Sequence, residues 1–170
     1  PTYAAVALSI FLGWQIVRAA VVTTGAPETA VKLAPRSPLA LSRAAEAEFK
    51  AGRLDNAAWL ARRSLEKAPF QASAARTLAL TFDRRGESER ADALMTLAGN
   101  WSLRDDAAHG WLVQRRLSVG DYGSAFAHAD VLARRRPDGR ERIFALLSTA
   151  SIEDPRALAA ILAGRGRESR

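Results

Sequence analysis

The sequence predicts an all-α protein, with one hydrophobic transmembrane helix at its N-terminus followed by an α-solenoid of helix-turn-helix hairpins. Residues 3–22 form a nearly unbroken apolar run. A helix of about 20 such residues matches the thickness of the hydrocarbon core of a bilayer. The rest of the chain repeats glycine and alanine at intervals of 34 residues, which is the sequence signature of stacked helical repeats.

Composition limits the kinds of partner and the means of stabilisation. The 170 residues carry a formal net charge of +7, and 48% of them are hydrophobic. A positive surface attracts anionic partners such as phospholipid head groups, acidic polysaccharide or acidic protein faces. Cysteine is absent, which excludes disulfide bonds and cysteine-ligated zinc. The fold must therefore be stabilised by packing.

The N-terminal segment, residues 1–23, is predicted to be a transmembrane anchor. Only Gln15 and Arg18 are strongly polar within the apolar run, and the long Arg18 side chain can reach the head groups from its place near one end. A cleavable signal peptide is the alternative, because small residues follow the run, but the run is longer than a typical signal core. Ala5, Ser9 and Gly13 are small residues that permit a second membrane helix to approach closely.

Residues 24–37 are predicted to form a proline-rich linker. Three of the seven prolines, Pro27, Pro35 and Pro38, fall within residues 23–38, at the junction of the anchor and the repeats. Because proline is unfavourable inside a helix and favours extended backbone, we expect an extended linker here. Such a linker would tether the repeat domain near the membrane without fixing it there.

The repeat domain, residues 38–170, divides into units at about 38–71, 72–105, 106–139 and 140–170. The repeated positions are Gly52, Gly86 and Gly120, then Ala57, Ala91, Ala125 and Ala159, and also Leu78, Leu112 and Leu146. Each glycine is expected to form a left-handed helix C-cap between two antiparallel helices. The alanines are expected where the two helices approach closely, and Asp55, Ser88 and Asp121 near the starts of the second helices. The predicted helices are 38–51, 54–67, 72–85, 88–98, 105–118, 122–135, 138–150 and 154–163.

This pattern resembles the tetratricopeptide repeat family, whose units are about 34 residues long and have small residues at these positions. The resemblance covers the whole repeat domain but departs from the family pattern in places. Leu103 stands where the second unit should end in proline, and Asp154 replaces a fourth glycine. Gly99 and Asn100 are expected to end the second helix of that unit early, which leaves Trp101 in a loop.

In this family the first helices of the hairpins form a concave wall along which a ligand segment lies. The resemblance therefore implies a partner-binding groove made of Phe49, Arg76, Leu80, Asp83, Arg84, Gln114 and Leu117, with Ser42 and Glu46 on the same wall and Arg116 beside it. Arginine binds a carboxylate through two parallel hydrogen bonds, so the groove suits a peptide that carries carboxylates. The alternative is an ordinary solvated face. The lysine and asparagine positions that clamp chaperone tails in this family do not match here, so a chaperone-tail receptor is not expected.

Two histidines, His109 and His128, are expected on the two helices of the third hairpin, whose packing would bring them together. They lack the spacing of a paired-histidine metal site and have no activated nucleophile nearby, so structural hydrogen bonds are the simpler role. The sequence contains no phosphate-binding glycine loop, GxSxG elbow or HExxH helix. We therefore expect no catalytic residue, no metal and no cofactor. The basic charge is not arranged as a recognition helix, so no nucleic-acid partner is expected.

These features predict a noncatalytic, membrane-anchored scaffold that binds protein partners and supports assembly of a bacterial cell-envelope or membrane complex. The resemblance, including segments 94–112 and 120–130, extends to envelope repeat proteins linked to surface polysaccharide. The alternative is a small accessory subunit of a larger membrane complex, bound through its transmembrane helix. The expected location is the inner membrane, with a single pass and a periplasmic repeat domain. The bilayer and an anionic lipid or polysaccharide are the further expected partners.

Overall fold

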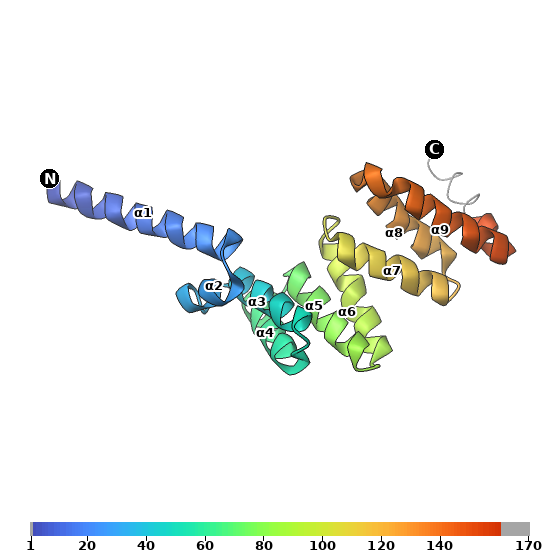
Figure 1. Cartoon of the computed structure of the whole chain (residues 1–170), viewed down its shortest axis with the longest axis horizontal. Helices are drawn as coiled ribbons and strands as arrows, with labels where there is room; N and C mark the ends of the chain where they lie inside the picture. The colour runs from blue at the N-terminus through green and yellow to red at the C-terminus, as the bar shows by residue number, and fades with distance from the viewer. Residues whose placement is uncertain (1, 161–170) are drawn as a thin grey trace. The chain divides into compact units, whose positions relative to one another are not determined.

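A computed structural model describes the backbone of residues 2–160 and the side chains of residues 7–160, and this part of the chain is all-helical without a β-strand (Figure 1). The elements are α1 (Thr2–Thr24), α2 (Pro27–Leu33), α3 (Pro38–Lys50), α4 (Leu54–Lys67), α5 (Ala72–Arg84), α6 (Ser88–Trp101), α7 (Asp106–Ser118), α8 (Tyr122–Arg135), the 3-10 turn η1 (Pro137–Gly139) and α9 (Arg140–Glu153). Helical backbone resumes at Pro155 and reaches Ala160. The end of the fourth repeat and the side chain of Ala5 lie outside the described residues. The chain divides into two compact units within α6, after Ala91.

The first helix, α1, is apolar on most of its surface and contributes little to a core. Among its residues, Ile10 is 69% exposed and Ile16 is 70% exposed. The segment Ala7–Thr24 is long and apolar enough to cross a membrane, and no other described helix meets that test. The prediction of one long apolar N-terminal helix is confirmed.

The expectation of an extended linker after α1 is wrong, because part of the segment folds into α2. Pro27 stands at the start of this helix, where its missing N–H and fixed φ are tolerated. Val22 of α1, Ala30 of α2 and Ala40 of α3 form one buried cluster. The Arg43 side chain also donates hydrogen bonds to the carbonyl oxygens of Val22, at 2.6 Å, and of Gly25, at 2.7 Å. These contacts attach the end of α1 to α3.

The glycines between paired helices have the conformation that the repeat pattern predicts. Gly52, Gly86 and Gly120 have φ values of 76°, 77° and 75°, in the left-handed region that glycine enters without a steric penalty. Ala57, Ala91 and Ala125 are each fully buried. A methyl group is a small side chain, so a buried alanine lets the paired helices approach closely.

The expected helix starts are only partly confirmed. The Asp121 side chain accepts a hydrogen bond from the Ser124 N–H at 3.2 Å and caps α8. Asp55 instead lies inside the first turn of α4 and pairs with Arg85, and Ser88 is already the first residue of α6. Short polar residues near a helix start therefore do not all occupy the capping position.

The prediction that Gly99 and Asn100 end the second helix of the second unit is wrong, since α6 continues to Trp101. Trp101 is a half-buried helical residue and does not lie in a loop. Gly99 is buried, and a Cβ atom there would lie 2.8 Å from Cδ1 of Leu112 on α7. Glycine is therefore used at this position for close helix packing and does not act as a helix breaker.

The fourth unit departs from the predicted register. The helices of the earlier hairpins are joined by three residues, whereas only Asp154 separates α9 from the helical segment that starts at Pro155. The shorter connection moves the buried small residue from the expected Ala159, which is exposed, to Ala157, which is fully buried. Leu146 is 43% exposed, whereas its counterparts in the earlier units are buried.

Candidate partner-binding surface

Helices α3 and α5, which lie side by side, carry the first part of the predicted groove. They are in direct contact, and Ser42 of α3 lies 2.7 Å from Ser73 of α5, oxygen to oxygen. Ser42 is buried, so it belongs to the packing between these helices and is not a ligand-facing residue.

An exposed arginine and an aromatic ring meet on this surface. The guanidinium carbon of Arg84 lies 5.7 Å from the centre of the Phe49 ring, within the range of a cation–π contact. Arg84 and Asp83 are exposed, while Phe49 and Leu80 are half-buried. We name this set the α3/α5 patch: Phe49, Leu80, Asp83 and Arg84. It combines an aromatic ring with charged side chains of both signs.

Arg76 has a different role from the one predicted for it. Its side chain is only 13% exposed, and it donates a hydrogen bond to Glu46 at 3.2 Å. Lys50 also pairs with Glu46, at 2.8 Å. Burial of Glu46 disfavours its charged form, but the hydrogen bonds and charges of Lys50 and Arg76 prevail and lower the pKa of the carboxyl. Arg76 is therefore engaged between α3 and α5.

The remaining predicted groove residues lie on α7, in the second compact unit. Gln114 is exposed and Leu117 is half-buried. Arg116, which was expected to flank the groove, donates a hydrogen bond to Asp92 at 2.8 Å and another to Thr96 at 2.9 Å. It thereby connects α7 to α6, so its main contribution is to packing within that unit.

The two histidines are brought together, as the hairpin pairing predicts. The Nδ1 atoms of His109 on α7 and His128 on α8 are 3.0 Å apart. Among the described residues no group of three or more histidine, cysteine, aspartate or glutamate side chains is placed to hold a metal ion. A hydrogen bond between the rings requires one Nδ1 to donate and the other to accept, so at least one ring is neutral.

The surroundings of the pair favour the neutral form of both rings. Burial lowers the pKa of His109 and outweighs the opposing effects of the Ser102 backbone and of the Asp105 and Asp106 charges. Burial also lowers the pKa of His128, and the charges of His109 and Arg116 act in the same direction. The pair thus serves as a neutral link between α7 and α8.

We expect this hairpin to lose stability as the pH falls below 6.5, the ordinary pKa of histidine. Below that value the histidines of the unfolded chain bind protons, whereas the folded pair stays neutral, so protonation favours the unfolded state. The loss of stability increases as the pH falls, until the pH reaches the lowered pKa values of the folded pair. Folding lowers the pKa values of Asp106 and Asp121 from 3.8. The stability that their charged forms contribute is therefore lost only at a more acidic pH than the contribution of the histidines. Hydrogen exchange of α7 and α8 amides at about pH 7.5 and about pH 5.5 measures the effect.

The matched variant for this prediction is His128→Gln, which retains hydrogen-bonding atoms but does not titrate. Its amide protection should depend less on pH than that of the natural chain, once intrinsic exchange rates are corrected for. An equally steep dependence in the variant, or greater protection of the natural chain in acid, would contradict the assignment of the pair.

The small residues of α1 define a second candidate surface. A Cβ atom added at Gly13 would meet no atom within 4 Å, and Leu12 and Trp14 on either side of it are exposed. Ser9 is also exposed and lies one helical turn earlier. The third predicted residue of this stripe, Ala5, has a side chain outside the described set.

The sequence reasoning missed Arg43, which bonds the end of α1 to α3. The available signal was an arginine within a run of small and apolar residues, between Ser42 and Ala44. A long cationic side chain rarely enters such a run unless its head group reaches a partner.

A scan against protein-family models and a search of curated proteins found no match to this chain.

Proposed function

We propose that this chain is a membrane-anchored scaffold of the tetratricopeptide type, which binds protein partners and supports assembly of a bacterial cell-envelope or membrane complex. In this proposal α1 crosses the inner membrane once, and the repeats lie in the periplasm. Complexes that handle surface polysaccharide are among the assemblies it would serve. The proposal concerns binding, with no enzymatic reaction.

The repeat assignment is supported by positions rather than by overall composition. Left-handed glycines recur at Gly52, Gly86 and Gly120, and each is followed five residues later by a fully buried alanine. Helical hairpins that repeat in this way each bury one face against the next, and their first helices remain available for a ligand.

The observation that carries partner binding is the α3/α5 patch. It combines an exposed arginine with a half-buried aromatic ring, and arginine and aromatic residues are frequent among those that dominate binding energy at interfaces. In this proposal the Arg84 guanidinium binds a partner's carboxylate while it stays over the Phe49 ring, a contact supported by their distance of 5.7 Å. The patch therefore suits an acidic peptide segment of a partner protein.

Charge reversal in Arg84→Glu is expected to reduce partner capture at least about tenfold, because a hot-spot arginine contributes more than about 1.4 kcal/mol. Arg63→Glu is the matched control, since Arg63 lies over Trp59 at 5.6 Å on α4, outside the α3/α5 patch. The measurement is quantitative mass spectrometry of proteins that co-purify with the full chain after gentle detergent extraction. Equal capture by the natural chain and by Arg84→Glu would remove the α3/α5 patch from the proposal.

The second candidate function is a small accessory subunit that binds a larger membrane complex through α1. The exposed Ser9 and Gly13, four residues apart, favour it, because small residues at this spacing let two membrane helices approach closely. Gly13→Phe should then release the chain from its complex. Leu8→Phe, which places the same ring on another face of α1, should not. If neither variant changes co-purification, the membrane helix is not the binding element.

A further inference from the structure

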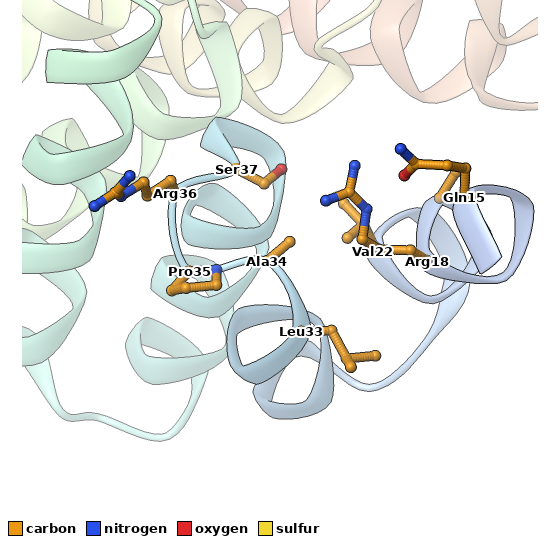
Figure 2. A pocket seen from close by; sticks show the side chains of 9 residues that line it. Gln15, Arg18, Val22, Leu33, Ala34, Pro35, Arg36 and Ser37 are labelled. Atoms are coloured by element: carbon orange, nitrogen blue, oxygen red, sulfur yellow. The ribbon is translucent and has the colours of Figure 1, made fainter. Parts of the chain in front are cut away.

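A cavity of about 690 Å³ lies between α1 and the segment that joins α2 to α3. Its lining residues are Gln15, Arg18, Ala19 and Val22 from α1, Leu33 from the end of α2, and Ala34, Pro35, Arg36 and Ser37 from the connecting segment (Figure 2). Its volume falls in the range of about 300–1,000 Å³ that is usual for small-molecule sites. The cavity exists because α2 packs against both α1 and α3, and because Arg43 bonds the end of α1.

The polar part of the lining is cationic. It contains two arginines and no carboxylate. In Figure 2 the Arg18 guanidinium and the Ser37 hydroxyl face the same open space, with the Gln15 amide beside Arg18, while Arg36 at the rim extends away from it. Neither Arg18 nor Arg36 has a hydrogen bond or ion pair with another described side chain. The Arg18 guanidinium, the Gln15 amide and the Ser37 hydroxyl can each donate a hydrogen bond to a phosphate oxygen in that space.

The rest of the lining is apolar, which distinguishes this cavity from a site for a free anion. Ala19, Val22, Leu33, Ala34 and Pro35 supply hydrocarbon surface next to the cationic groups. Leu33 is 36% exposed. A ligand that contacts both the cationic and the apolar part of the lining would carry a negatively charged phosphodiester joined to apolar chains.

If α1 crosses the membrane as proposed above, the cavity lies near the level of the lipid head groups, where such a ligand is found. Arg18 is six residues before the end of α1 at Thr24, or about 9 Å along the helix. An arginine at that depth directs its guanidinium toward the head groups. Basic pockets between membrane helices, described for the cytoplasmic face of membranes, bind the head groups of anionic lipids, and the same chemistry applies on any face that carries anionic lipid.

We infer that this juxtamembrane cavity binds the head group of an anionic phospholipid, with Arg18 on the phosphodiester and the acyl chains along Ala19 and Leu33. Gln15 and Ser37 are neutral donors that complete the head-group contacts. The bound lipid would lie against the junction of α1, α2 and α3. The repeats would thereby take a defined position at the membrane surface in the presence of anionic lipid.

The test uses the full chain in detergent, supplied with equal amounts of phosphatidylglycerol and phosphatidylcholine, and native mass spectrometry to count retained lipid. The natural chain should retain phosphatidylglycerol with a preference of about tenfold, the scale of one charge-assisted hydrogen bond. Arg18→Gln should abolish the preference, whereas Arg104→Gln, which removes the same charge from another exposed site, should preserve it.

A second pair of variants tests the cavity without altering charge. Ala19→Phe fills the apolar part and should reduce lipid retention, whereas Ala20→Phe adds the same ring to a neighbouring residue that does not line the cavity and should not. The inference is overturned if the natural chain shows no preference, or if each control loses as much lipid as its partner variant. It is also overturned if excess inorganic phosphate displaces the lipid, because the ligand is then a free phosphate.

Membrane anchorage is measured separately by alkaline carbonate extraction. A chain that stays in the membrane but shows no lipid preference disproves the cavity alone. A chain that carbonate releases, but that still retains phosphatidylglycerol at Arg18, disproves the transmembrane anchor and leaves the head-group site in place.

Discussion

Replacement of Leu112 by alanine is expected to destabilise the second compact unit by about 2–5 kcal/mol. Leu112 is fully buried in α7, and its Cδ1 atom occupies the space that a side chain at Gly99 of α6 would need. Truncation to alanine therefore removes apolar contacts and leaves a cavity at the crossing of two helices. Because the chain has two compact units, a single unfolding transition need not report this loss. Hydrogen exchange of α6, α7 and α8 amides locates it.

The same contact predicts coupling between Leu112 and Gly99. In the natural chain, Gly99→Ala gains about 1 kcal/mol of helix propensity but drives a Cβ atom against Leu112. In the Leu112→Ala background the contact is gone, so the propensity gain remains and Gly99→Ala should partly restore stability. Gly110→Ala is the control, because a Cβ atom there meets nothing within 4 Å, and its effect should be the same in both backgrounds. Identical effects of Gly99→Ala in the two backgrounds would mean that the close approach does not limit packing.

If α1 is the membrane anchor proposed above, two arginines placed in it are expected to move the chain from the membrane to the soluble fraction. Leu12 and Ile16 are 51% and 70% exposed within the segment that is apolar enough to span a bilayer. Each arginine near the centre of a membrane helix costs about 2.5–3.5 kcal/mol. The double variant Leu12→Arg with Ile16→Arg therefore opposes insertion by about 5–7 kcal/mol if the two effects add.

The matched control for this double variant is Leu103→Arg with Val119→Arg. These two residues are also apolar and exposed, at 63% and 53%, but lie outside α1. The control adds the same charge without entering the span, so the chain should still resist alkaline carbonate extraction. Resistance of the α1 double variant to carbonate would show that this helix is not the anchor.

The repeat pattern predicted the helices well because it reports local requirements. A glycine in the left-handed region, an apolar stripe with helical spacing and a proline after a helix each act within a few residues. The pattern therefore placed α4 and α8 at their observed bounds. It failed at Gly99, where the reason for glycine lies in another helix. It also failed at Ala159, where the connection before the helix is shorter than in the earlier units.

The candidate sites were less predictable than the helices. Family resemblance placed Phe49 and Arg84 on one wall, and they are in contact. It did not distinguish Arg84, which is exposed, from Arg76, which pairs with Glu46. Residue type is the same in both cases, and only the neighbouring helix determines which arginine is engaged. The cavity beside α1 was missed because a proline-rich segment was expected to be extended.

The sequence by itself determined that the chain is helical, that it begins with an apolar helix, and that its hairpins turn at Gly52, Gly86 and Gly120. These properties follow from backbone preference and hydrophobic spacing, which are present in any short stretch of the chain. The tertiary structure alone decided that Arg43 bonds the end of α1 and that His109 meets His128. Those contacts depend on which residues face each other across packed helices, and small changes in loop length or helix bounds alter them.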